Sequence, residues 1–86
     1  MSDTTPGIPV AALLPTWQSH KTVRAQKIRE VKEDLIYLDG PYGPVQAATN
    51  MFSRYMPVPG DYYVVYDDGY ASISPAKAFE EGYHKL

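Results

Sequence analysis

One stretch near the carboxyl end constrains the fold most, because it combines a strand signal, a turn signal and a helix start. Residues 62–66 read Tyr-Tyr-Val-Val-Tyr, a run of aromatic and β-branched side chains that is typical of a strand. Asp68 and Gly69 follow, and this pair favours a two-residue type I′ turn, which needs positive φ at both central positions. Residues 61–74 are therefore expected to form an antiparallel hairpin.

A turn centred on Asp68 and Gly69 also fixes the register of this hairpin. It places Val64 opposite Ile73, and because side chains alternate along a strand, it divides the hairpin into two faces. The expected core face carries Tyr62, Val64, Tyr66, Ala71 and Ile73. The expected outer face carries Tyr63, Val65, Asp67, Tyr70, Ser72 and Ser74.

A helix over residues 75–81 is expected directly after the hairpin. Ser74 can accept a hydrogen bond from a free amide of the first turn, and Pro75 loses no hydrogen bond at the first helical position. Phe79 lies on the stripe that would pack inward, and Gly82 suits the end of the helix.

Composition limits the class of protein. The chain has 86 residues, enough for one small domain, and a core this small makes a homo-oligomer a reasonable expectation. It has no cysteine, which excludes disulfides and zinc–thiolate sites. A formal net charge of −2 argues against general nucleic-acid binding, and no apolar run approaches the about 20 residues that span a bilayer.

The chain before the hairpin is harder to interpret. Residues 1–15 are expected to be a flexible arm, or an arm that docks Leu13 and Leu14 on a neighbouring subunit, and residues 16–86 a single domain. Residues 21–31 fit two patterns. Propensity and spacing favour a helix, whereas a strand needs a bulge before Ile28.

Residues 60–83 carry a family resemblance. They resemble the end of a group of small proteins encoded by tailed phages and prophages: a Gly-x-Tyr strand, an Asp-Gly-Tyr turn, a Ser-Pro helix start and a final Phe-Glu-x-Gly-Tyr. Residues 19–28, Ser-His-Lys-Thr-Val-Arg-Ala-Gln-Lys-Ile, are similar to a second, looser motif, although Ile73 stands where an aromatic residue is common. The resemblance favours a strand over 21–31 and implies a phage accessory protein in the host cytoplasm.

Few residues suggest chemistry. His20 and His84 are the only histidines, and they form neither a metal-ligand pattern nor a triad, so no catalytic residue, metal or cofactor is predicted. A basic cluster is formed by His20, Lys21, Arg24 and Lys27, and it is either a solvated face or an anion site on which tyrosines stack a base. The candidate binding residues are Trp17, His20, Lys21, Arg24, Tyr63 and Tyr70.

The sequence thus predicts an α+β domain: a small antiparallel sheet of about four strands, with the hairpin 61–74 and a C-terminal helix 75–81. The expected function is non-enzymatic binding of a host protein through the outer tyrosines, in host takeover or defence evasion, with Trp17 as an extra anchor. Two alternatives stand beside it. One is sequestration of a small anionic, nucleotide-like signal by Lys21 and Arg24, and the other is a minor structural or assembly protein of the virion.

Overall fold

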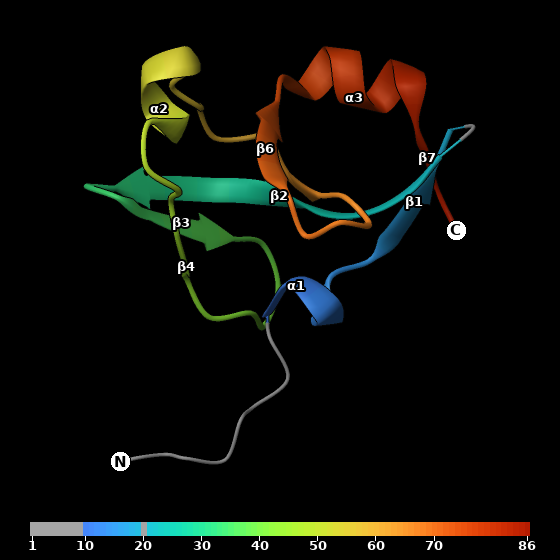
Figure 1. Cartoon of the computed structure of the whole chain (residues 1–86), viewed down its shortest axis with the longest axis horizontal. Coiled ribbons are helices and arrows are strands. Elements are labelled where there is room, and N and C mark those ends of the chain that lie inside the picture. Colours follow the sequence, from blue (N-terminus) through green and yellow to red (C-terminus); the bar gives the residue numbers. More distant parts are fainter. Residues whose placement is uncertain (1–9, 20) are drawn as a thin grey trace.

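The computed structural model describes residues 10–19 and 21–86, and within them the chain forms seven strands in one mostly antiparallel sheet, with three short helices (Figure 1). The elements are α1 (Val10–Leu13), β1 (Thr16–Gln18), β2 (Thr22–Lys32), β3 (Leu35–Leu38), β4 (Val45–Gln46), α2 (Met51–Arg54), β5 (Tyr62–Val65), β6 (Ala71–Ser74), α3 (Ala76–Gly82) and β7 (His84–Lys85). The α+β class is confirmed, with more strands than the four expected.

The long strand β2 connects the sheet. Its start pairs with β1, its middle with β5 and its end with β3. The strand interpretation of residues 21–31 is therefore correct. The strand is irregular after Ile28, with a register shift between Ile28 and Glu30, and not before Ile28 as expected. Tertiary pairing on both edges outweighs a local propensity that favours helix.

The additional strands are short, and each is held in place by hydrogen bonds to a neighbouring strand. β1 joins β2 to β7, while β4 adds two residues to β3. Beyond β7, the amide of Leu86 donates a 3.0 Å hydrogen bond to the carbonyl of Thr16. Strands of two or three residues leave almost no pattern in a sequence, so their number was underestimated.

The expected hairpin is present as β5 and β6, but its register is one residue away from the expectation. Val64 pairs with Ser72 rather than with Ile73. The loop has three residues, because the Tyr66 amide donates to the Tyr70 carbonyl at 2.9 Å. Gly69 has a φ of 87°, whereas Asp68 is not among the residues with positive φ, so the turn is not of type I′.

This register produces a sheet with a core on each side. One core cluster contains Tyr63 and Val65, and the other contains Tyr62 and Val64, so β5 is buried on both faces. Figure 1 shows α1 and α3 on opposite sides of β2 and the hairpin. The expected division of the hairpin into one core face and one surface face was therefore wrong.

Helix α3 covers the second core with Phe79, one residue displaced from the predicted range. Its first free amide, that of Ala76, donates to Oδ1 of Asp61 at 3.0 Å, so an aspartate from the start of β5 takes the role expected of Ser74. The helix and the hairpin are thus tied together by a buried carboxylate, which is only 4% exposed.

The described part of the predicted arm belongs to the folded domain. Leu14 is 1% exposed in the first core cluster, with Val10 and Ala11 packed against it. The domain consequently begins before residue 16, and residues 1–9 lie outside the described residues. Within the described chain, no helix is long and apolar enough to cross a membrane.

Candidate binding surface at the hairpin tip

The hairpin tip holds one large aromatic side chain at the surface in a defined position. The three-residue loop closes with a 2.9 Å bond from the Gly69 amide to the Tyr66 carbonyl. Oδ1 of Asp68 accepts a 2.9 Å bond from the Tyr70 amide, which fixes the backbone at the point where Tyr70 leaves the loop. Asp68 therefore has the role of a turn residue, as its residue type suggests.

The Tyr70 ring is supported on two sides although 48% of the residue is exposed. Its ring stacks on Tyr66 with centroids 6.0 Å apart and planes 25° from parallel. Arg54, at the end of α2, donates from Nη1 to the Tyr70 hydroxyl at 2.9 Å and places its guanidinium carbon 6.0 Å from the ring centre. These contacts hold one rotamer of an exposed aromatic residue before any partner binds.

Two open grooves, of about 440 and 610 Å³, lie beside the hairpin loop and share part of their lining. Both are lined by Val23 and Tyr66; the larger also reaches Lys21 and Tyr70, and the smaller reaches Arg24. Three of the predicted binding residues are thus brought to the same region. We call this region the hairpin-tip surface; it comprises Lys21, Arg24, Arg54, Tyr66, Asp67, Asp68 and Tyr70.

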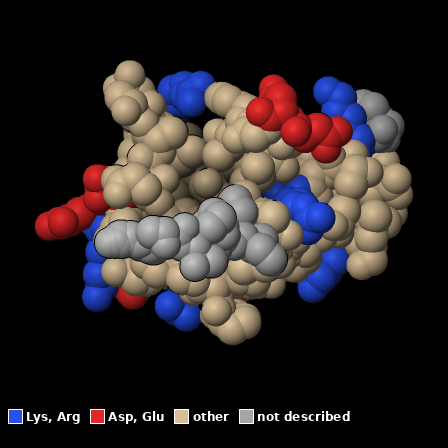
Figure 2. Space-filling model, turned by 60° about the horizontal axis from the view of Figure 1, so that its bottom comes forward, with Lys and Arg blue, Asp and Glu red and all other residues tan. Residues whose placement is uncertain are grey.

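The charges on this surface are mixed. Asp67 and Asp68 line the larger groove together with Lys21, and Asp67 also lines the smaller groove with Arg24. Nη1 of Arg24 already donates a 3.0 Å bond to the carbonyl of Leu14. Figure 2 shows basic and acidic side chains interspersed on the face that carries α1. With two carboxylates beside three bases, the surface has mixed charge and does not build the uniformly positive field that concentrates anions.

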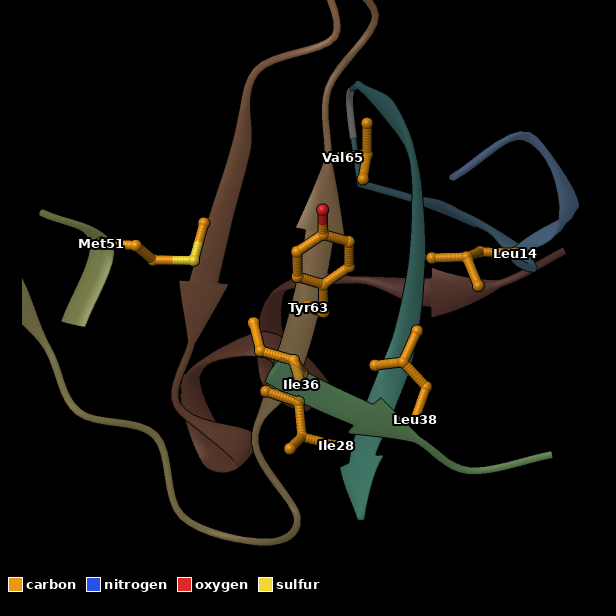
Figure 3. Packing of buried hydrophobic residues seen from close by; sticks show 7 residues of the cluster. All are labelled: Leu14, Ile28, Ile36, Leu38, Met51, Tyr63 and Val65. Atoms are coloured by element: carbon orange, nitrogen blue, oxygen red, sulfur yellow. The ribbon is translucent and has the colours of Figure 1, made fainter. Parts of the chain in front are cut away.

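Tyr63 does not belong to the surface, in contrast to the prediction. It is 8% exposed in the first core cluster, and Figure 3 shows it between Val65 and Ile36. The physical reason is that β5 lies between β2 and β6 with a core on each face, so the face that carries Tyr63 and Val65 is covered as well. Burial raises the pKa of the Tyr63 phenol.

Trp17 is partly buried and packs against the second core cluster. Its ring lies edge-on to Tyr62 and Phe79, with centroids 5.4 and 4.9 Å away. Its indole nitrogen is buried without a hydrogen-bond partner among the described residues. His20, the remaining predicted residue, lies outside the described residues.

Two residues of importance were not predicted. Arg54 is a single exposed residue at the end of a one-turn helix, so no spacing in the sequence connects it with Tyr70. Asp61 accepts bonds from the Tyr55 hydroxyl at 2.8 Å and the Val58 amide at 3.0 Å, besides that of Ala76. The bond to Asp61 raises the pKa of Tyr55. Because aspartate next to glycine is common in turns, its residue type did not indicate that Asp61 accepts several hydrogen bonds.

The titratable tyrosines of the sheet are held in their neutral form. Burial, with a smaller contribution from Tyr83 and Tyr70, raises the pKa of Tyr66. Burial and a 2.8 Å bond to Glu80 raise the pKa of Tyr62 to about 12. These phenols are therefore hydrogen-bond donors at neutral pH. Among residues 10–19 and 21–86, no three His, Asp or Glu side chains are grouped as metal ligands.

A comparison with known proteins finds no matching family, no matching curated protein and no matching solved structure.

Proposed function

We propose that this protein is a non-enzymatic accessory protein of a tailed phage or prophage and that it binds a host protein through the hairpin-tip surface. The phage origin rests on the resemblance of residues 60–83, and the mode of action on the surface just described. Binding would occlude the host protein, in host takeover or defence evasion, in the host cytoplasm.

The observation that carries the proposal is the supported, exposed ring of Tyr70. Tyrosine and arginine are enriched among the residues that dominate the energy of protein interfaces. A ring already stacked on Tyr66 and bonded to Arg54 loses little side-chain entropy when a partner covers it. A side chain that is both fixed and half exposed therefore favours a contact with another protein.

The charge of the surface supports a protein rather than an anion as the partner. Asp67 and Asp68 face Lys21 across one groove, and such interspersed charges resemble the polar rim of a protein interface. The raised pKa of Tyr66 also removes it as a general base near neutral pH, which is consistent with a binding function.

Removal of the ring tests the proposal. Tagged protein is incubated with lysate of a bacterium that the phage infects, and the bound host proteins are identified. Tyr70→Ala should abolish recovery of a host protein that the parent chain recovers, because truncation of a central tyrosine typically costs about 2 kcal/mol or more. Arg54→Ala should weaken recovery, since it leaves the ring unsupported.

Two matched controls accompany these variants. Tyr37 lies on β3 outside both core clusters, and Arg29 is exposed on β2, so Tyr37→Ala and Arg29→Ala should leave recovery unchanged. Equal recovery by the parent chain and by Tyr70→Ala, or recovery of no host protein by the parent chain, would contradict the proposal.

One observation favours the second function, sequestration of an anionic nucleotide-like signal: Lys21 and Tyr70 line the same groove. A bound nucleotide would raise the melting temperature in proportion to the logarithm of its concentration. A panel of nucleotides that produces no shift with the parent chain removes this function.

A further inference from the structure

We propose that the partner of the hairpin-tip surface contributes an extended segment with an acidic side chain, and that this segment adds as a strand to the free edge of β6. This inference deepens the function proposed above and rests on it. Three features support it: the unpaired backbone groups of β6, the groove between β6 and α2, and the side chain of Arg54 at that groove.

The backbone of β6 presents hydrogen-bonding groups to the outside. The Tyr66 amide donates to the Tyr70 carbonyl, so the backbone of Tyr70 faces β5, and alternation makes Ser72 and Ser74 do the same. The amides and carbonyls of Ala71 and Ile73 consequently point away from β5. No hydrogen bond within the described residues engages them. This row of donors and acceptors matches an extended chain.

The sequence of β6 also lacks the residue types that usually discourage such pairing, and α2 lies beside this edge across a groove. Natural edge strands are shielded by charged residues, by proline or by extreme shortness. The other two ends of the sheet have these features, since β4 has two residues and follows Pro44, and β7 has two residues and includes Lys85. The four residues of β6 are Ala-Ser-Ile-Ser, without charge or proline.

A small groove of about 150 Å³ runs beside this edge and is lined by residues of α2 and of β6. Ser72 and Ile73 both line it although their side chains point to opposite faces, so the groove follows the edge itself. Figure 3 shows the side chain of Met51, on α2, pointing toward β6. Sites for small molecules are larger, about 300 Å³ or more, so the groove does not enclose a compact ligand; its position along the edge suits a strand that lies over it.

The charge at the groove defines the chemistry of the segment. Among the described residues, Arg54 is the one charged residue that lines it, together with Met51, Tyr55, Ser72 and Ile73. Its guanidinium is exposed and donates one hydrogen bond to the hydroxyl of Tyr70. A carboxylate accepts two parallel bonds from such a group and is a stronger acceptor than a phenol. The added strand should therefore carry Asp or Glu beside Arg54.

Synthetic peptides test this inference directly with the full chain. The probe is the blocked hexapeptide Thr-Val-Glu-Val-Thr-Val, and binding is followed by the amide resonances of the protein. The signals of Ala71 and Ile73 should shift most. A peptide with Lys in place of Glu should bind about tenfold more weakly, and Arg54→Ala should remove this difference. A peptide N-methylated at every residue has no amide donor on either edge, so it cannot pair as a strand and should not bind.

Several results would overturn the inference: equal binding of the N-methylated peptide, equal binding of the Lys peptide, or shifts confined to residues outside β6 and α2. A concentration-dependent dimer whose formation alone shifts Ala71 and Ile73 would assign the edge to a second copy instead. Loss of host-protein recovery in Tyr70→Ala with no peptide binding would refute strand addition and leave the proposed function intact.

Discussion

Replacement of Asp61 tests how the fold supports the binding surface. Its buried carboxylate accepts bonds from the Tyr55 hydroxyl, the Val58 amide and the Ala76 amide. These donors belong to the loop before β5 and to the start of α3, so one side chain joins three segments. Asp61→Asn preserves the shape but turns one oxygen into a donor, which then faces a donor of the protein.

The expected loss follows from these bonds. A hydrogen bond to a charged group contributes about 1.5–3 kcal/mol, and a buried amide left without a partner costs about 1–3 kcal/mol. Oriented with its oxygen toward Tyr55 and Val58, the Asn side chain keeps two bonds and orphans the Ala76 amide. We therefore expect Asp61→Asn to lower the free energy of unfolding by about 2–3 kcal/mol. Asp61→Ala, which orphans both amides, should lose about 3–5 kcal/mol.

Urea unfolding followed by circular dichroism measures these losses, and thermal unfolding should show a fall of about 10 °C or more for Asp61→Asn. Asp67→Ala is the matched control, because Asp67 is exposed and its removal changes the net charge by the same amount. A loss below about 0.5 kcal/mol in Asp61→Asn, equal to that of the control, would refute this account of the carboxylate.

Three further predictions concern the core, the tyrosines and the turn. Leu14→Ala should lower the free energy of unfolding by about 2–5 kcal/mol, because Leu14 is buried in the first core cluster. Leu13→Ala, at a half-exposed position, should change it by less than about 0.5 kcal/mol. Equal effects of the two variants in urea unfolding would show that this segment does not pack on the core. The pKa of Tyr62 is raised to about 12 in the folded protein, so its contribution to stability should be complete below pH 10 and be lost as the pH rises from 10 to about 12. Tyr62→Phe should flatten this part of the curve of unfolding free energy against pH, and an unchanged slope would contradict the assignment. Gly69→Ala should cost about 1–2 kcal/mol through backbone strain alone, since its φ is 87° and no atom lies within 4 Å of an added Cβ; Gly43→Ala, equally open and without positive φ, should be nearly neutral by the same measurement.

The sequence predicted the order strand, turn, strand and helix because each signal there is local. β-branched and aromatic residues, a glycine turn and a proline helix start act within a few neighbouring positions. The register was wrong because Gly69 suits both a two-residue and a three-residue loop. Alternation could not decide between them, since β5 is buried on both faces and has no polar side.

The candidate site was partly predictable from the types of its residues. Lys21, Arg24 and Tyr70 were proposed from residue type, and the fold brings them to adjoining grooves. Tyr63 was wrongly assigned to the surface because β5 was expected to have one exposed face, whereas a core covers each of its faces. Arg54 could not be found, since its contact with Tyr70 depends on how α2 lies beside β6 and leaves no trace in the spacing.

Amide hydrogen exchange at the hairpin turn tests the central claim most directly, because the register decides which residue of the first strand pairs with Tyr70. The observed pairing predicts slow exchange for the Tyr66 amide, which donates to the Tyr70 carbonyl, and fast exchange for the amide of the exposed Asp67. A two-residue turn at Asp68 and Gly69 would pair Asp67 with Tyr70 instead, so slow exchange at Asp67 together with fast exchange at Tyr66 would contradict the account.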